Sequence, residues 1–328
     1  MDQQKILIVQ LGRIGDLILM TPMFAAIKRD NPLHEIHLLC GRRNAAFAGT
    51  LPDITKVHTY RKTLPGLLRL LTSLRAEHYE CWIDPKDHYS GESALFARWA
   101  NAPFAIGFNR EGRRRVFTHS ITKTGADVRR HFLDLNLDAL VPFLGATDVP
   151  RRPCLNEDPA SAARLTAFLA DRAITRFAVV NFSTGKAYRQ WPADHWIALI
   201  NSFPDASFLI NGEAADLAAV QQIEARCPNA AHYQTRSFAD VISLVRHAAL
   251  LISPDTSLIH VASAFDIPTV GLYLKGEWNR TLWTPLSREH RVIIGPSEHL
   301  ISAIGVDAVM AAVREVSGAM AKGRTDVA

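Results

Sequence analysis

Apolar residues along this 328-residue chain alternate between short unbroken runs and stretches where they recur at helical spacing. Unbroken runs predict buried strands, and recurrence every three or four residues predicts helices. In the first half the pattern predicts strands at 5–9, 35–40, 56–59, 80–83 and 104–108, and helices at 17–29, 64–76, 93–100 and 130–144. In the second half it predicts strands at 177–182, 207–211, 250–252, 268–273 and 291–294, and helices at 160–173, 193–203, 214–226, 238–248, 258–265 and 302–321.

This alternation of strands and helices predicts an α/β fold with parallel sheets covered on both faces. A proline-bearing segment, 145–159, separates two series of similar length, so we expect two Rossmann-like, doubly wound domains at 1–150 and 151–328. The terminal helix either stays with the second domain or packs back on the first. Two such domains joined by a short linker are expected to face a central cleft between the carboxyl edges of their sheets.

The overall composition is that of a globular protein, with 48% hydrophobic and 21% charged residues. A net charge of +5 favours an anionic ligand or an anionic membrane surface and is too small to indicate nucleic-acid binding. The most apolar long region, 248–274, contains Asp255, His260 and Asp266, which argues against a membrane span. Four separated cysteines without a CxxC pair favour a reduced state. We therefore expect a cytoplasmic monomer, able to rest on the inner face of the cytoplasmic membrane.

The turn after the first predicted strand carries Gly12, Gly15 and Asp16. Its glycines are spaced GxxG, not GxGxxG, which argues against an NAD-dependent oxidoreductase. Asp16 has two interpretations: it caps the following helix, or it is a general base that accepts a proton from a hydroxyl nucleophile. Gly15 would permit close approach of a sugar to the backbone.

The loop 181–192 follows another strand and contains Lys186 and Arg189. Both cations could hold a diphosphate, Arg189 through its planar fork and Lys186 as a point charge. The alternative is a solvated loop that Trp191 anchors to the core. At the end of the next strand, the Glu213 carboxylate could accept hydrogen bonds from a ribose, or the segment is an ordinary turn.

The stretch 250–264 joins a strand to a helix through Asp255, Thr256 and Ser257, all of them N-cap residue types. A helix N-terminus at the carboxyl end of a strand is a site for phosphate. Because Asp255 would repel phosphate, its expected partner is a hydroxyl-rich part of the same ligand. His260 lies about one turn further in. Alternatively, Asp255 only caps the helix and His260 belongs to the core.

Metal-binding signatures are missing from the sequence, which has neither DxD nor HExxH, and the His34–His37 pair has no further ligand nearby. We therefore predict no catalytic metal.

Three segments together resemble the ADP-heptose:lipopolysaccharide heptosyltransferases, the family 9 glycosyltransferases. Residues 15–22 (Gly-Asp-Leu-Ile-Leu-Met-Thr-Pro) resemble the GDxxxxTP signature of that family, and residues 188–192 (Tyr-Arg-Gln-Trp-Pro) resemble its Lys-Arg-Trp-Pro segment. Residues 255–264, followed by Pro-Thr-Val-Gly-Leu-Tyr at 268–273, resemble its DTGxxHLAAA and PTVxLF block. The resemblance covers nearly the whole chain, in the family's order.

The resemblance implies a GT-B fold, with the acceptor bound by the first domain and the nucleotide-sugar by the second. It implies an inverting, metal-independent reaction without a cofactor, in which ADP-heptose is the donor. Asp16 matches the family's base, Arg189 its phosphate-binding lysine and Asp255 the residue that holds heptose hydroxyls. The backbone at Thr256 and Ser257 would then donate to the diphosphate.

The implied acceptor is a lipid-anchored glycan, the lipopolysaccharide inner core. The basic residues Arg110, Arg113 and Arg114 could meet its phosphates or acidic sugars, or they form an exposed loop. Alternative functions are glycosylation of another acceptor, such as a protein or another surface glycan, and nucleotide-sugar binding without catalysis.

Two positions depart from the family pattern: Ser257 replaces a glycine, and Arg189 replaces a lysine. The acid that reads the ribose is either Glu213 or Asp216.

Overall fold

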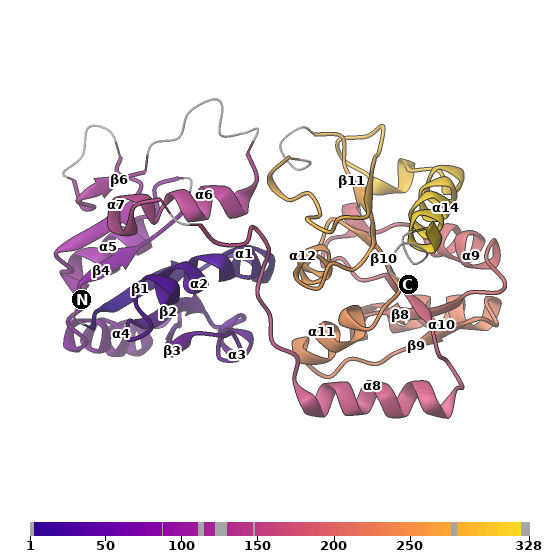
Figure 1. Cartoon of the computed structure of the whole chain (residues 1–328), viewed down its shortest axis with the longest axis horizontal. Coiled ribbons are helices and arrows are strands. Elements are labelled where there is room, and N and C mark those ends of the chain that lie inside the picture. Colours follow the sequence, from indigo (N-terminus) through magenta and orange to yellow (C-terminus); the bar gives the residue numbers. More distant parts are fainter. Residues whose placement is uncertain are drawn as a thin grey trace. The chain divides into compact units, whose positions relative to one another are not determined.

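The computed structural model describes residues 3–86, 88–110, 115–121, 130–146, 148–276 and 281–322. The chain forms two compact units, Met1–Asn156 and Glu157–Ala328, each built on one parallel sheet (Figure 1). The two Rossmann-like α/β sheets predicted from the sequence are confirmed. Among the described helices, none has the combination of length and apolar content needed to cross a membrane.

The first unit has the sheet order β3-β2-β1-β4-β5-β6. Its strands are β1 (Lys5–Gln10), β2 (Glu35–Gly41), β3 (Ile54–Tyr60), β4 (Cys81–Ile83), β5 (Phe104–Gly107) and β6 (His119–Ser120). Its helices are α1 (Ile14–Leu19), α2 (Thr21–Asp30), α3 (Ala45–Ala48), α4 (Leu64–Ala76), α5 (Gly91–Ala100), α6 (Phe132–Asp138) and α7 (Val141–Leu144). In this order β1 is central, and the chain changes direction across the sheet between β1 and β4.

The second unit repeats this topology, with the order β12-β11-β10-β7-β8-β9. Its strands are β7 (Phe177–Asn181), β8 (Ser207–Asn211), β9 (Ala230–His232), β10 (Leu250–Pro254), β11 (Thr269–Tyr273) and β12 (His290–Ile294). Its α-helices are α8 (Pro159–Asp171), α9 (Ala193–Asn201), α10 (Leu217–Arg226), α11 (Phe238–Arg246), α12 (Ser257–Ala264) and α14 (Val306–Lys322), and its 3₁₀ turns are η2 (Ala187–Arg189), η3 (Ala214–Asp216) and η4 (Ile301–Ala303). Ligands of such sheets bind at the carboxyl edge, where the strand order reverses. Here that point lies between β7 and β10.

Alternate residues of the central strands face opposite layers of helices. In the first unit Leu7 and Val9 of β1 join a buried cluster with Leu74 of α4 and Phe96 of α5. In the second unit the strands pack on α9, α10 and α14, while α8, α11 and α12 form the other layer (Figure 1). The terminal helix α14 therefore packs on β11, β12 and α9 of its own unit.

Two helices predicted as continuous are each broken in two. The predicted helix 17–29 is α1 and α2, and the predicted helix 130–144 is α6 and α7. Each second helix has a proline, Pro22 or Pro142, in its first turn. Proline has no N–H to donate to the carbonyl four residues earlier. At the first break the hydroxyl of Thr21 donates to the carbonyl of Ile18 instead, at 2.7 Å.

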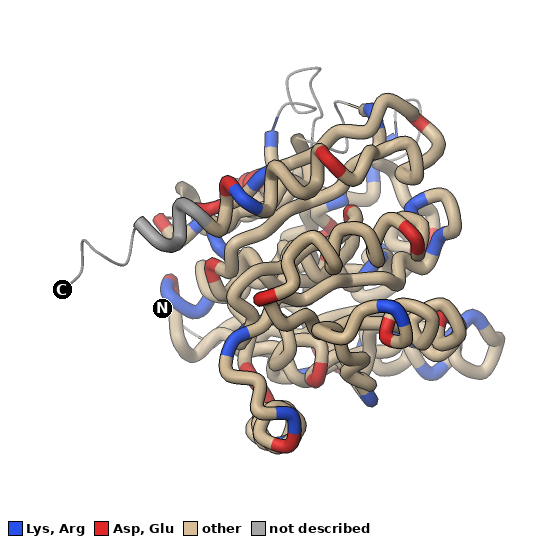
Figure 2. The backbone as a smooth tube through the Cα atoms, turned by 90° about the vertical axis from the view of Figure 1, so that its right-hand side faces the viewer, with Lys and Arg blue, Asp and Glu red and all other residues tan. Residues whose placement is uncertain are grey.

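Charged residues of both signs lie close together on the second unit. On the face that Figure 2 shows, Lys and Arg are interspersed with Asp and Glu along the helices. This mixture differs from the one-sided basic stripe typical of nucleic-acid-binding proteins. It agrees with the small net charge of the sequence.

Candidate functional site

The carboxyl edge of the second sheet holds a buried polar network centred on Asn181, the last residue of β7. Its Nδ2 donates to the hydroxyls of Ser253 and Thr256, both at 3.0 Å, and its Oδ1 accepts from Asn211 Nδ2 at 2.9 Å. Asn181 is fully buried. One amide thus connects the ends of β7, β8 and β10, at the point where ligands of this fold bind.

The loops after β7 and β8 are joined through Ser183. The Ser183 hydroxyl donates to Asp216 Oδ2 at 2.6 Å and accepts from the backbone N–H of Glu213 at 2.6 Å. Gln190 donates to the other Asp216 oxygen at 3.1 Å. Asp216 is therefore used to hold the two loops together, whereas the side chain of Glu213 is exposed.

Arg189 and Asp255 form an ion pair across the loops that follow β7 and β10. The Arg189 Nη1 lies 3.1 Å from Asp255 Oδ2 and also donates to the Asp255 carbonyl at 3.0 Å. Only 14% of the Arg189 side chain and 12% of the Asp255 side chain are exposed. Lys186, in the same loop as Arg189, is exposed.

The helix α12 begins directly after this ion pair. Thr256 is its N-cap, and the Thr256 hydroxyl accepts from the backbone N–H of Leu258 at 3.4 Å. Ser257, the first helical residue, is half-buried, and His260 is only 4% exposed. Because the first N–H groups of a helix have no partner within the helix, this end can receive an anion.

Asp16 and Gly15 lie in the first unit, in the short helix α1 after the central strand β1. Asp16 is half-buried, and its Oδ2 accepts from the backbone N–H of Arg13 at 3.4 Å, so it caps the helix. A Cβ atom on Gly12 would lie 3.2 Å from the same Oδ2 and 2.7 Å from Gln10 Oε1, so a larger residue here would displace the side chain of Gln10. Gly15 is buried in the helix and offers only backbone.

The basic residues predicted to bind the acceptor follow β5. Arg110 is exposed, three residues after the carboxyl end of that strand. Arg113 and Arg114 lie outside the described residues.

The structure thus brings Arg189, Asp255 and Thr256 together at one edge of the second sheet. Sequence reasoning did not predict roles for Asn181, Asn211 and Ser183, although these hold the site in place. The signal was present in the sequence, since Asn181 and Asn211 each end an apolar run at the carboxyl end of a strand. What the run does not reveal is that their side chains meet.

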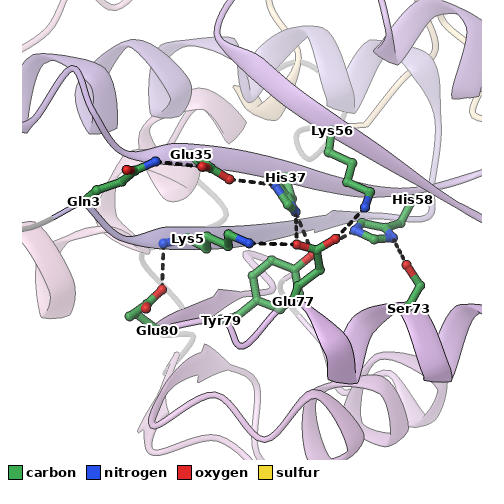
Figure 3. Close-up of polar contacts among 10 residues, drawn as sticks. All are labelled: Gln3, Lys5, Glu35, His37, Lys56, His58, Ser73, Glu77, Tyr79 and Glu80. Atoms are coloured by element: carbon green, nitrogen blue, oxygen red, sulfur yellow. Dashed lines mark hydrogen bonds and ion pairs between the residues drawn. The ribbon is translucent and has the colours of Figure 1, made fainter.

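A second polar cluster lies in the first unit, on β2, β3 and the segment after α4 (Figure 3). The Tyr79 hydroxyl lies 2.8 Å from both His37 Nδ1 and His58 Nε2. The outer ring nitrogens of the two histidines contact Glu35, at 3.5 Å, and Ser73, at 3.3 Å.

Among the described residues, His37, His58 and Glu77 are the one group with the residue types and proximity to hold a metal ion. The Glu77 carboxylate, however, is paired with the ammonium groups of Lys5 at 3.0 Å and Lys56 at 2.5 Å (Figure 3). The inner nitrogens of both histidines are already bonded to Tyr79. We therefore interpret this group as a structural hydrogen-bond chain.

Acid is expected to destabilise the first unit through this chain. Burial lowers the pKa of His58 to about 4, and burial also lowers the pKa of His37. Because these values lie below the ~6.5 of an unfolded histidine, the unfolded state binds protons first as the pH falls. The contribution of the two uncharged histidines to the free energy of unfolding is complete above about pH 6.5. It is lost as the pH falls towards 4, by up to ~1.4 kcal/mol per pH unit for each imidazole.

Urea titrations at several pH values would measure this loss. Replacing His58 with Gln should flatten the dependence between pH 6.5 and 4, whereas the same change at the exposed His299 should not. An unchanged slope in the His58→Gln variant would contradict the assignment. At lower pH a further loss of stability is expected from Glu77. The hydrogen bond of Glu77 with Lys56 lowers the pKa of Glu77 to about 2, so protonation of this carboxylate favours the unfolded state.

Comparison with known proteins identifies a family whose members resemble this chain. Residues 67–303 match the family model for glycosyltransferase family 9 (heptosyltransferase). Lipopolysaccharide heptosyltransferase 3 of Escherichia coli is 24% identical over 293 residues, covering 83% of this chain and 84% of that protein.

Two solved structures have the same fold. The family 9 glycosyltransferase of Veillonella parvula has a TM-score of 0.81 at 18% identity, covering 96% of this chain and 97% of that chain. The E. coli heptosyltransferase WaaC with ADP-2-deoxy-2-fluoro heptose has a TM-score of 0.73 at 17% identity, covering 95% and 99%. The predicted GT-B architecture is confirmed by this likeness. Since the family model matches most of its length, this chain belongs to glycosyltransferase family 9, the heptosyltransferase family.

Proposed function

We propose that this protein transfers a heptosyl group from ADP-heptose to a sugar hydroxyl of a lipopolysaccharide inner-core acceptor. The observation that carries the proposal is the Arg189, Asp255 and Thr256 cluster, which lies within the family match at the carboxyl edge of the second sheet. This edge is where a nucleotide binds in such folds. The relatives named above are lipopolysaccharide heptosyltransferases.

In this proposal the diphosphate of the donor lies at the N-terminus of α12. The backbone N–H groups at Thr256 and Ser257, together with Arg189 and Lys186, face its negative charge. Such groups stabilise a leaving diphosphate without the participation of a metal ion. Asp255 accepts hydrogen bonds from hydroxyls of the heptose.

Glu213 is the better candidate for reading the ribose. Both oxygens of Asp216 are already bonded, to Ser183 and Gln190, whereas the Glu213 side chain is exposed beside them. Asn211 Oδ1 is buried and accepts no hydrogen bond from the described residues, so a ligand hydroxyl would satisfy it.

The proposed chemistry is a single inverting displacement. The acceptor hydroxyl oxygen bonds to the anomeric carbon of the heptose as the bond from that carbon to the phosphate oxygen breaks. ADP leaves with the bonding electron pair, and the hydroxyl proton passes to the Asp16 carboxylate. His260 lies about one turn into α12 from the proposed phosphate site and is 4% exposed.

The acceptor assignment rests on Arg110, Arg113 and Arg114. Guanidinium groups bind phosphates and carboxylates in planar, bidentate geometry, which suits a phosphorylated or acidic core sugar. Since such an acceptor is lipid-anchored, the protein would act at the inner face of the cytoplasmic membrane. The proposal keeps the monomer expected from the sequence.

The test is to incubate the full chain with ADP-heptose and, in parallel, with heptose-free and heptose-bearing core glycolipids, and to measure ADP release and the glycolipid mass. The expected result is acceptor-dependent release of ADP, a mass increase of one heptose, and an inverted anomeric configuration. Release should persist with excess EDTA, and ADP-glucose serves as the control donor. Binding of ADP without any release would indicate a silent nucleotide-sugar binder, and release only with a protein or another glycan would indicate a different acceptor.

A further inference from the structure

The contact between Arg189 and Asp255 is unusual for a residue whose proposed role is to bind phosphate. One nitrogen of the guanidinium, Nη1, grips both the side chain and the backbone carbonyl of Asp255. The two residues are 66 positions apart and come from loops after β7 and β10. Arg189 therefore binds Asp255 in addition to its proposed role of binding the diphosphate.

The backbone N–H of Asp255 is held by a contact that does not involve Arg189. This N–H donates to the carbonyl of Leu272 in β11 at 3.0 Å. The side-chain hydroxyl of the next residue, Thr256, accepts from Asn181. Since the N–H of Asp255 is held by β11, the ion pair between Nη1 and Oδ2 acts on the direction in which the Asp255 carboxylate points.

Arg189 also has a second hydrogen-bond donor, its Nε–H group. Its Nε is buried and has no hydrogen-bond partner among the described residues. Burying an N–H without a partner is unfavourable, so such groups mark places where a ligand atom completes the bonding. In a guanidinium, Nε and Nη1 donate in different directions, which a lysine ammonium on a flexible stem cannot reproduce.

We propose that Arg189 is a positioning residue for Asp255, and that it thereby sets the preference of the site for a sugar nucleotide over the bare nucleotide. Nη1 orients the carboxylate that reads hydroxyls of the donor sugar, while Nε remains available for a phosphate oxygen. The sugar is taken to be heptose, which rests on the function proposed above. A lysine at this position would supply the phosphate charge but would not hold Asp255.

The test is calorimetric titration of the full chain with ADP and, separately, with ADP-heptose in the absence of acceptor. For Arg189→Lys we expect ADP affinity within about threefold of wild type, and a loss of about tenfold in the preference for ADP-heptose over ADP. Asp255→Asn should reduce the same preference. The double variant should lose no more than the larger single loss, because both changes remove one interaction.

Lys186→Gln is the matched control, since Lys186 is a cation in the same loop whose side chain is exposed. It should weaken ADP and ADP-heptose equally and leave the preference unchanged. The proposal is overturned if Arg189→Lys also weakens both ligands equally, as it would with a phosphate role alone or with general damage to the site. A wild type that does not prefer ADP-heptose over ADP would instead contradict the donor assigned above.

Discussion

Replacing Asp16 with asparagine is expected to lower the rate of heptosyl transfer by about 10²–10⁴-fold, the usual contribution of a general base. Asparagine keeps the shape of the side chain and an oxygen that can accept from the Arg13 N–H, but it cannot take up a proton. ADP affinity should remain unchanged, since the proposed nucleotide site belongs to the second unit. Initial rates and calorimetric titration with ADP would measure the two quantities.

The control for this variant is Asp30→Asn, a partly exposed carboxylate at the end of α2 in the same unit, whose Oδ2 lies 3.5 Å from His34 Nε2. It should transfer at the wild-type rate. If Asp16→Asn also transfers at the wild-type rate, Asp16 is only a helix cap. In that case the effect of Asp16→Ala would be on stability, by about 0.5–2 kcal/mol.

Replacing Trp191 with alanine is expected to cost about 3–5 kcal/mol of unfolding free energy, as for other large buried aromatic residues. Trp191 is fully buried, and its ring packs edge-to-face on Trp196, with centroids 4.7 Å apart. Its Nε1 donates to the carbonyl of Ile304 at 2.9 Å. Because Trp191 follows Arg189 by two positions, ADP affinity should also fall. Urea unfolding and ADP titration would measure both effects.

Two further variants separate the causes. Trp191→Phe keeps most of the ring and removes the indole N–H, so it should cost less than Trp191→Ala. Trp99→Ala, in the first unit, removes a tryptophan that is 50% exposed and should change stability by no more than about 0.5 kcal/mol. If the alanine variants at 191 and 99 are equally stable, Trp191 does not anchor the loop.

Local pattern predicted most of the elements. The apolar runs became β1, β2, β7 and β8, because a strand covered on both faces must be apolar along its whole length. The pattern failed at Pro22 and Pro142, where apolar spacing continues through a break in hydrogen bonding. It also missed β9, whose Ala-Ala-His sequence is too short to show a period and is held by pairing with β8.

The sequence by itself determined the two alternating halves, the turns with Asp16 and Thr256, and the family to which the chain belongs. These features depend on residues that are close together in the sequence, so the order of residues along the chain is sufficient to predict them. The tertiary structure decided that Arg189 holds Asp255, that Asn181 joins three strand ends, and that Asp216 is engaged by Ser183. These contacts join residues 30 to 75 positions apart, and no local pattern encodes them, because they arise only when parallel strands bring their carboxyl ends to one edge.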